Sequence, residues 1–245
     1  MVLRLFPRVS FANFTIMKKK ICITGGSKGI GLAIARKFYQ EGFEVIICAR
    51  GQAALEAAKA EMPELHTLRC DLSHKSEVKQ LAETLNRDFG ALDVLINNGG
   101  VFLPGLVHLE KDEVYEMLIR TNLDSTYYLT KGVIGQMMAR RSGMVVNMCS
   151  IASLAAYPNG GSYTISKFGM LGFSKVLREE MKPYGIRVVS IMPGAVKTAS
   201  WEGVDLPDER FIPASDIAEI VWNAWNMHPS TVIEEIVVRP TPGDI

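Results

Sequence analysis

A tyrosine and a lysine four residues apart, Tyr163 and Lys167, are the first candidates for proton chemistry in this sequence. On a helix, residues at this spacing share one face. A lysine ammonium beside a phenol favours the phenolate and lowers its pKa from the usual value of about 10, which suits a group that exchanges a proton near neutral pH. Tyr127 and Lys131 have the same spacing, so the pair alone is weak evidence.

Ser150 distinguishes the two tyrosine–lysine pairs. It lies thirteen residues before Tyr163, directly after the strand predicted over 144–149, whereas the matching position before Tyr127 is Val114, inside a predicted helix. Ligands of open α/β sheets bind outside the carboxyl ends of the strands. The sequence therefore predicts one site that contains Ser150, Tyr163 and Lys167.

A glycine-rich segment, Thr24-Gly25-Gly26-Ser27-Lys28-Gly29-Ile30-Gly31, follows a short apolar run near the N-terminus. A strand, a glycine turn and a helix start place free backbone N–H groups, and the positive end of the helix dipole, where a pyrophosphate can bind. The glycine spacing differs from the standard G-x-G-x-x-G pattern. A tight turn without any ligand therefore remains an alternative.

Apolar strand-like runs alternate with amphipathic helical stretches along the sequence. The predicted strands carry few polar residues, as expected for a parallel sheet covered on both faces. They span residues 20–24, 44–48, 65–70, 93–97, 144–149, 187–191 and 233–238, and the main predicted helices span 30–38, 53–61, 76–89, 113–138, 163–182 and 215–226. This order predicts an α/β fold: a single-domain, doubly wound parallel sheet with helices on both faces.

Composition narrows the function classes. The 245 residues are 48% hydrophobic and carry a net charge of +1, which gives no electrostatic argument for a nucleic-acid or membrane-surface partner. The cysteines fall at or near predicted strands without a C-x-x-C pair, and the four histidines lack metal-ligand spacing. We therefore expect no metal, reduced cysteines and a cytoplasmic location.

Residues 1–16 differ from the rest of the chain. They contain two arginines and no acidic residue, but they lack a continuous apolar segment and a clear cleavage site. We predict a poorly ordered extension over 1–16 and the functional domain over 17–245, with a targeting peptide as the alternative.

Taken together, the motifs resemble those of the short-chain dehydrogenase/reductase family, from Lys20 to the end of the chain. The matching positions are Thr24 to Gly31, Asn97-Asn98-Gly99-Gly100, Asn122, Ser150, Tyr163 with Lys167, and Pro193-Gly194 with Thr198. The resemblance implies a Rossmann-type fold and hydride transfer to or from a nicotinamide. Gly99 departs from the family's usual alanine, and we expect the missing methyl group to loosen that turn slightly.

The resemblance also implies roles for individual residues. The expected catalytic set is Asn122, Ser150, Tyr163 and Lys167: Tyr163 exchanges the proton, Ser150 binds the substrate oxygen, and Lys167 contacts the nicotinamide ribose and lowers the tyrosine pKa. Asn122 would hold a water that links Lys167 to solvent. An asparagine that distorts its helix for packing reasons is the alternative.

The implied cofactor site is more extended. Besides Tyr163 and Lys167, its expected residues are Gly25, Ser27, Lys28, Gly29, Ile30, Gly31, Arg50, Asp71, Leu72, Asn98, Gly99, Gly100, Pro193, Gly194, Val196 and Thr198. Asp71 and Leu72 would bound the adenine, although Asp71 could equally cap the helix that follows.

The choice between the two nicotinamide cofactors follows from the second predicted strand. An NAD site places a carboxylate at its end, but this strand is followed by Arg50. A guanidinium matches a ribose 2′-phosphate, and Lys28 adds a second positive charge. The sequence therefore favours NADP(H), with two solvated basic residues as the alternative.

The predicted substrate pocket has a largely apolar lining of Leu154, Tyr157 and Trp201 beside Ser150. It favours a small, fairly apolar carbonyl or alcohol. Two alternatives are a sepiapterin reductase-like pterin reductase, suggested by the chain ending, and a catalytically silent dinucleotide-binding sensor or scaffold.

The sequence also predicts assembly of identical chains. Apolar residues lie on more than one face of two predicted helices, which favours a homodimer or homotetramer over an apolar monomer surface. They are Leu118, Ile119, Leu123, Leu129, Val133 and Met137 on the first helix and Met170, Leu171, Phe173, Val176 and Leu177 on the second.

Overall fold

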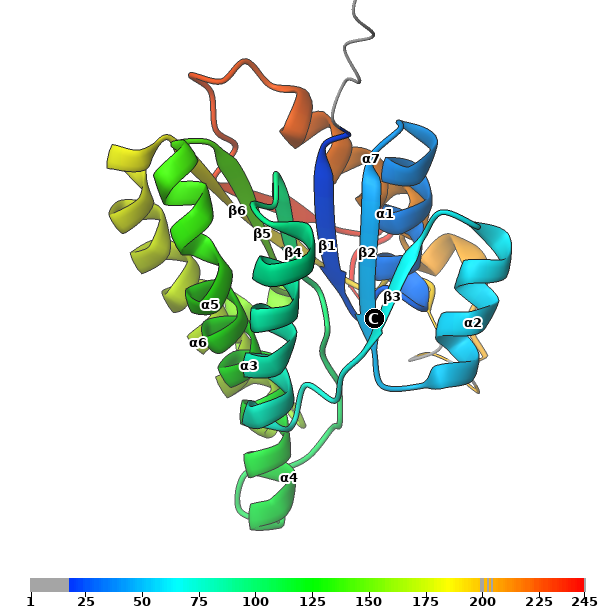
Figure 1. Cartoon of the computed structure of the whole chain (residues 1–245). Helices are drawn as coiled ribbons and strands as arrows, with labels where there is room; N and C mark the ends of the chain where they lie inside the picture. Colours follow the sequence, from blue (N-terminus) through cyan, green and yellow to red (C-terminus); the bar gives the residue numbers. More distant parts are fainter. Residues whose placement is uncertain (1–17, 199–200, 202, 204, 245) are drawn as a thin grey trace, which may run out of the picture.

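A computed structural model describes residues 18–198, 201, 203 and 205–244 (Figure 1). Seven parallel strands form one sheet in the order β3-β2-β1-β4-β5-β6-β7. The strands are β1 Lys20–Thr24, β2 Glu44–Ala49, β3 His66–Arg69, β4 Val94–Asn97, β5 Gly143–Met148, β6 Ile186–Pro193 and β7 Glu235–Val238. The predicted doubly wound α/β fold is confirmed, and all seven predicted strands are present.

Helices cover both faces of the sheet (Figure 1). They are α1 Gly29–Gln40, α2 Gln52–Glu61, α3 Lys75–Thr84, α4 Asp112–Leu118, α5 Ser125–Arg140, α6 Gly161–Met181 and α7 Ala214–Asn226. Short 3-10 turns follow β5 at η3 Ile151–Ser153 and α6 at η4 Lys182–Tyr184, and a third, η6 Asp208–Arg210, precedes α7.

The alternation of side chains along the strands builds a hydrophobic core on each face of the sheet. In β1, Ile21 and Ile23 belong to the core formed with α1, α2 and α7, whereas Cys22 belongs to the core formed with α3, α5 and α6. Successive strand residues point to opposite faces, so a strand that is apolar throughout is buried on both sides. This burial fixes the register of the strands whose ends carry the functional site.

The chain order reverses between β1 and β4. Strands β2 and β3 extend the sheet on one side of β1, and β4 to β7 extend it on the other. Such a switch point leaves a crevice at the carboxyl ends of the strands, where open α/β sheets bind ligands. The loop after β4 leads to α4, which projects beyond the lower edge of the sheet in Figure 1.

Two predicted helices are interrupted. The helix predicted over 113–138 consists of α4, a π-helical segment η2 Ile119–Asp124, and α5, and the helix predicted over 76–89 ends in a second π-helical segment, η1 Leu85–Phe89. Hydrophobic periodicity does not detect an inserted residue that changes i→i+4 bonds to i→i+5 bonds. The catalytic-helix candidate also starts earlier than predicted, so Tyr163 lies in the first turn of α6.

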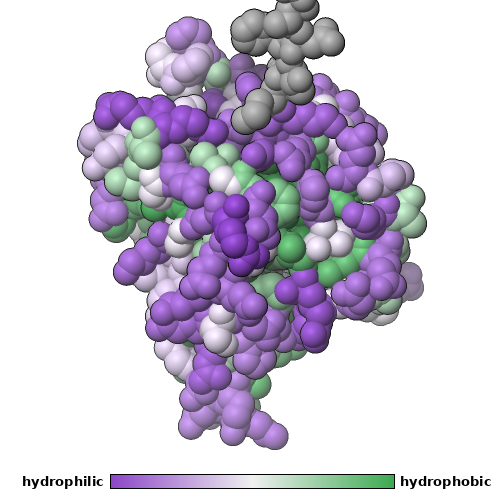
Figure 2. All heavy atoms as spheres, in the orientation of Figure 1, coloured by the Kyte–Doolittle hydropathy of each residue, from purple (hydrophilic) through white to green (hydrophobic). Residues whose placement is uncertain are grey.

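The surface turned toward the viewer in Figure 2 is mainly hydrophilic, with hydrophobic residues visible in patches near its middle. No helix in the described ranges is both long enough and apolar enough to span a membrane. The predicted N-terminal extension, residues 1–16, lies outside the described residues.

Most of the apolar residues predicted to mediate assembly do not lie on the protein surface. Seven of the eleven are buried in the protein interior: Leu118, Leu129, Val133, Met137, Met170, Leu171 and Leu177. The two long helices instead expose a different apolar set, which we call the α5–α6 patch: Tyr127, Ile165, Phe168 and Val176. The apolar faces by which α5 and α6 pack against the sheet are wider than the sequence pattern suggested. Only Val176 belongs both to the residues predicted to mediate assembly and to the α5–α6 patch.

Candidate active site

The glycine turn after β1 has the conformation that a phosphate site requires. Gly25 and Gly29 have left-handed backbones, with φ of +64° and +53°. A Cβ at Gly31 would lie 2.4 Å from the Gly25 oxygen, so only glycine permits this close packing. Lys28 precedes α1 without capping it through its side chain, and the first turn of α1 has no acidic residue. The positive helix end is therefore open to an anionic ligand.

Two predicted cofactor segments from opposite ends of the chain meet at this turn. A Cβ at Gly29 would lie 3.0 Å from the Thr198 methyl group, so the loop after β6 lies against the glycine turn. That loop is held by pairing between Val196 and Ile212 and by a 2.8 Å hydrogen bond from the Gly194 N–H to the Val238 oxygen. Pro193 is the last residue of β6.

Thr24 and Asn98 connect the glycine turn to the end of β4. The Thr24 hydroxyl accepts hydrogen bonds from the N–H groups of Asn98 at 2.9 Å and Gly99 at 2.8 Å. The Asn98 side-chain amide donates to the Thr24 oxygen at 2.9 Å and to the Gly25 oxygen at 3.3 Å. The side chain of Asn98 thus fixes the shape of the cradle.

Gly99, the departure from the family pattern, is compensated by a neighbouring side chain. A Cβ at Gly99 would lie 2.2 Å from Cδ1 of Leu72, so the leucine occupies the space in which an alanine methyl group would lie. Gly99 is buried. The expected loosening of this turn is wrong, because Leu72 fills the gap. A Cβ at Gly100 would instead face Asn122, 3.1 Å from its Oδ1.

Asp71 forms the turn that leads into α3. Its Oδ1 accepts hydrogen bonds from the Ser73 N–H at 3.0 Å and from the Ser73 hydroxyl at 2.8 Å. Partial burial favours the neutral acid, but these hydrogen bonds and the nearby Arg50 charge outweigh it and hold the pKa of Asp71 below its ordinary value. The Asp71 side chain therefore holds the turn before α3 and does not cap that helix, which begins at Lys75 without a side-chain cap, so the capping alternative is wrong.

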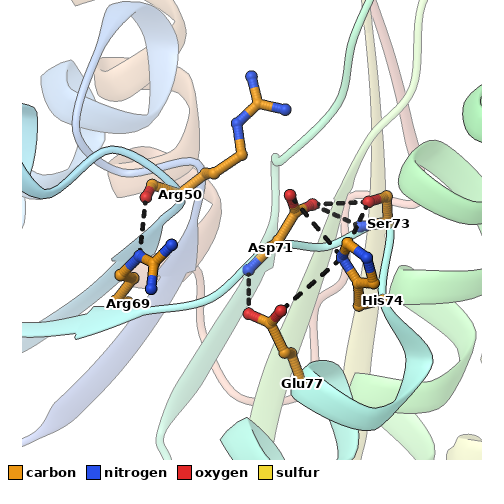
Figure 3. Close-up of polar contacts among 6 residues, drawn as sticks. All are labelled: Arg50, Arg69, Asp71, Ser73, His74 and Glu77. Carbon is orange, nitrogen blue, oxygen red and sulfur yellow. Dashed lines mark hydrogen bonds and ion pairs between the residues drawn. The ribbon is translucent and has the colours of Figure 1, made fainter.

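Arg50 follows β2, and its guanidinium points away from the Asp71 cluster (Figure 3). The residue is exposed, and among the described residues its guanidinium forms no ion pair. Arg69, at the end of β3, donates from Nε to the Arg50 backbone oxygen at 3.4 Å. Sequence reasoning missed Arg69, although the pairing of Ala49 with Arg69 follows from aligning the ends of the two strands.

Ser150 and Tyr163 come together as predicted. Ser150 follows β5, and its hydroxyl accepts a 3.1 Å hydrogen bond from the Ala152 N–H at the start of η3. Burial raises the pKa of Tyr163, and a hydrogen bond with the Ser150 side chain opposes that rise. The Tyr163 ring also makes an edge-to-face contact with Phe102, with ring centroids 4.9 Å apart.

Lys167 lies beside Tyr163, but its influence differs from the prediction. Its Nζ is 5.8 Å from the centroid of the Tyr163 ring and donates a 2.8 Å hydrogen bond to the Met148 oxygen. The side chain is buried, and burial lowers the pKa of the ammonium. The predicted lowering of the Tyr163 pKa is wrong for this structure, because burial of the phenol is the larger effect.

Asn122 lies in the π-helical segment η2, fully buried. Its Oδ1 accepts from the Val101 N–H at 2.9 Å, and its Nδ2 donates to the Val101 oxygen at 3.0 Å and to the Ser166 hydroxyl at 3.0 Å. The side chain thus fixes the loop after β4 and connects it to α6. These contacts correspond to the packing alternative, and the predicted role in holding a water remains a prediction.

The predicted substrate residues form the outer part of the site. Leu154 and Tyr157 follow η3 and are 43% and 41% exposed. Burial raises the pKa of Tyr157, and the charge of an ionised Tyr163 would add to the rise. Trp201 packs against Phe211, with ring centroids 5.3 Å apart. The segment around Trp201 includes residues 199, 200, 202 and 204, which lie outside the described residues.

Comparison with known proteins identifies the family. Residues 19–207 match the family model for short chain dehydrogenases. The sepiapterin reductase of Chlorobaculum tepidum is 32% identical over 94% of this chain and 99% of its own length. The 3-oxoacyl-[acyl-carrier-protein] reductase FabG of Chlamydia pneumoniae is 33% identical over 76% of this chain and 77% of its own. The crystal structure of a metagenomic short-chain oxidoreductase in complex with NADP matches with a TM-score of 0.81 and 31% identity, over 91% of this chain and 97% of that one.

The chain therefore belongs to the short-chain dehydrogenase family of oxidoreductases. Over the part of the chain that the structure describes, no group of three histidine, cysteine or acidic residues is arranged to hold a metal ion. The four cysteines are free and buried.

Proposed function

We propose that this chain is an NADP(H)-dependent oxidoreductase that transfers a hydride between the nicotinamide and a small, fairly apolar carbonyl or alcohol. The observation that carries the proposal is the placement of Lys167 beside Tyr163: the buried Lys167 Nζ is 5.8 Å from the Tyr163 ring centroid and donates to the Met148 oxygen at the end of β5, the strand that Ser150 follows. A sensor or scaffold would need the glycine cradle but not this arrangement of proton donors.

In the proposed reaction Tyr163 is the general acid and base. In the direction of reduction it gives its phenolic proton to the substrate oxygen, and in the direction of oxidation it accepts that proton. Ser150 donates a hydrogen bond to the same oxygen and stabilises the charge that develops there. Burial raises the pKa of Tyr163 and so favours its protonated form, which is the form that donates in the direction of reduction.

The cofactor residues suit a phosphorylated dinucleotide, and NADPH when bound supplies the hydride. The cradle of Gly25, Gly29 and Gly31 would receive the pyrophosphate at the start of α1. Arg50 would pair with the ribose 2′-phosphate, with Lys28 nearby, and its exposed guanidinium without an ion-pair partner among the described residues supports this. The NADP bound to the similar metagenomic oxidoreductase is consistent with the proposal.

For the substrate we propose a compact and mainly apolar carbonyl compound. Phe102, Leu154 and Tyr157 are about 40% exposed and lie on the two segments that flank Tyr163. A pterin carbonyl is the second candidate, because the Chlorobaculum tepidum sepiapterin reductase matches almost the full length of both chains.

A substrate screen with the purified protein tests this function. Small ketones, aldehydes, diketones and sepiapterin would be incubated with NADPH or NADH while the absorbance of the reduced nicotinamide is followed. We expect turnover of the apolar carbonyls and a preference for NADPH. Tight NADPH binding without turnover of any compound would instead support the sensor or scaffold alternative.

We also propose that the chain forms a homodimer or homotetramer through the α5–α6 patch. Gly135 and Gly172 lie on these two helices, and a Cβ at either position would meet no described atom within 4 Å, which would let a second chain approach closely. Light scattering should give a multiple of the 27.0 kDa chain mass, and Val176→Glu should reduce it. An active species of monomer mass would contradict this proposal.

The free, buried state of all four cysteines supports a reducing environment. We accordingly propose a cytoplasmic location, which fractionation of the cells that produce the protein would test.

A further inference from the structure

The first turn of α6 carries Tyr163 but is not capped by its own sequence. Gly160, the residue before the helix, has no side chain to accept a hydrogen bond, and the first turn contains no acidic residue. The first N–H groups of a helix need partners from outside the helix. In a helix whose second and third residues are Ser162 and Tyr163, those partners decide how firmly the phenol is held.

Glu110, from the loop after β4, supplies the missing cap. Its two carboxylate oxygens each accept a hydrogen bond from the Ser162 N–H, at 3.2 Å, and Oε2 also accepts from the Ser162 hydroxyl. Ser162 is 2% exposed, so these bonds are shielded from water. A carboxylate at the start of a helix also interacts favourably with the helix dipole.

Two glycines make room for this carboxylate. A Cβ at Gly161 would lie 2.1 Å from Oε1 of Glu110, and a Cβ at Gly105 would lie 2.5 Å from the same oxygen. Gly161 also has a left-handed backbone, with φ of +39°. The carboxylate is therefore enclosed by backbone on both sides, in a space that any larger residue at either position would fill.

The contact is part of a wider attachment between the loop and α6. The Gly105 N–H donates a 2.9 Å hydrogen bond to the Asn159 oxygen, and Gly105 pairs with Gly160 as an isolated bridge. Nearer β4, Asn122 fixes Val101 through two hydrogen bonds. The loop is thus held at Val101 and again at Gly105 and Glu110, and between these points Phe102 packs against the Tyr163 ring.

We propose that Glu110 is a positioning residue for Tyr163: its carboxylate fixes the first turn of α6 to the loop after β4. The inference rests on the proposed function, in which Tyr163 exchanges the proton. Displacing a reacting group by about 1 Å costs on the order of 100-fold in rate, so the hold on this turn affects turnover directly.

Three substitutions test the role of the carboxylate. Glu110→Ala should lower kcat by roughly 10- to 100-fold while the affinity for NADPH, followed by nicotinamide fluorescence, stays unchanged. Glu110→Gln keeps an acceptor oxygen for Ser162 and should restore kcat to within about tenfold of wild type, as a neutral hydrogen bond is weaker than a charged one. The matched control is Glu113→Ala, an exposed acidic residue in the first turn of α4, which should change neither quantity.

A double-mutant cycle separates the hold on α6 from general damage to the fold. Gly105→Ala places a methyl group against the Glu110 carboxylate. Gly105 does not have a left-handed backbone, so an alanine strains only this contact and should lower kcat much as Glu110→Ala does. In the Gly105→Ala/Glu110→Ala double variant the methyl group meets no carboxylate. The double variant should therefore be no slower than Glu110→Ala alone, whereas additive losses would overturn the proposal.

Hydrogen exchange provides a readout that does not depend on turnover. Amides in a peptide covering 159–167 should exchange faster in Glu110→Ala than in wild type or Glu113→Ala, while peptides from β1 and α1 stay unchanged. Unchanged exchange in 159–167, or a Glu110→Ala enzyme as fast as Glu113→Ala, would refute the role of Glu110. A third outcome separates the two proposals. If Glu110→Ala exchanges faster than wild type but wild type reduces no carbonyl compound, the proposed function is refuted and the anchoring role of Glu110 is supported.

Discussion

Replacing Tyr163 by phenylalanine removes one hydroxyl group and leaves the ring in place. The ring's edge-to-face contact with Phe102, at 4.9 Å between centroids, does not involve that hydroxyl. The group that is lost is the hydroxyl whose pKa Ser150 lowers and which the proposed reaction uses to exchange the proton. Tyr163→Phe should therefore fold and bind NADPH as wild type does, and it should fail in proton transfer.

The size of the loss follows from the role assigned to the phenol. A positioned general acid contributes about 100- to 10,000-fold to a rate. At about 1.36 kcal/mol per factor of ten, that range corresponds to roughly 3 to 5 kcal/mol of transition-state stabilisation. Because the proton moves only in the transition state, kcat and kcat/KM should fall together, with KM little changed.

The chain provides a matched control for this experiment. In the second tyrosine–lysine pair, Nζ of Lys131 is 5.7 Å from the Tyr127 ring centroid, against 5.8 Å for Lys167 and Tyr163. Tyr127 is 43% exposed, and its ring contacts Tyr128 instead of a serine at a strand end. Steady-state kinetics and NADPH titration of both phenylalanine variants should show a loss only for Tyr163→Phe. A severe loss in Tyr127→Phe, or full activity in Tyr163→Phe, would refute the placement of the site.

Three further predictions concern the cofactor, the proton and the packing of the cradle. Arg50→Asp should shift the ratio of kcat/KM values from NADPH toward NADH by roughly 10- to 100-fold, because charged hydrogen bonds are worth about 1.5–3 kcal/mol; an unchanged ratio would mean that another residue reads the phosphate. Ser150→Ala removes the side chain that lowers the Tyr163 pKa, so the phenolate should form at higher pH. The rising limb of the pH profile of alcohol oxidation should then move to higher pH, and a shift to lower pH would contradict this assignment. Gly99→Ala should lower the free energy of unfolding by about 1–3 kcal/mol in urea titrations, because its methyl group overlaps Leu72, and Leu72→Ala in the same chain should recover part of that loss.

Local patterns were sufficient to predict the sheet. The run around Cys22 is apolar on both faces, and in the structure Ile21 and Ile23 pack on one side while Cys22 packs on the other. A short apolar run bounded by turn residues is a local signal that is consistent with a buried strand. The positions of Ser150 and Tyr163 followed for the same reason, since one lies after a strand and the other lies on the helix that follows.

Contacts between distant segments could not be predicted in the same way. Asn122 was assigned a role next to Lys167, but its side chain is bonded to Val101, twenty-one residues earlier in the chain. The capping role of Glu110 had no sequence signal at all, because Ser162 lies fifty-two residues further on. Geometry of this kind depends on how a loop folds over a helix, and periodicity contains no information about it.

The pKa of Tyr163 depends on the local sequence spacing and on tertiary burial. The four-residue spacing placed Lys167 on the same side of α6 as the tyrosine, but the ammonium is bonded to the Met148 oxygen and is itself buried. Burial disfavours the charged form of each group, so it raises the pKa of the phenol and lowers that of the ammonium. Both shifts favour a neutral pair, and a neutral phenol is the form that donates a proton. We therefore expect the phenolate of Tyr163 to form at higher pH than that of an exposed tyrosine, and the pH at which the phenol loses its proton measures how strongly its burial opposes the charged form.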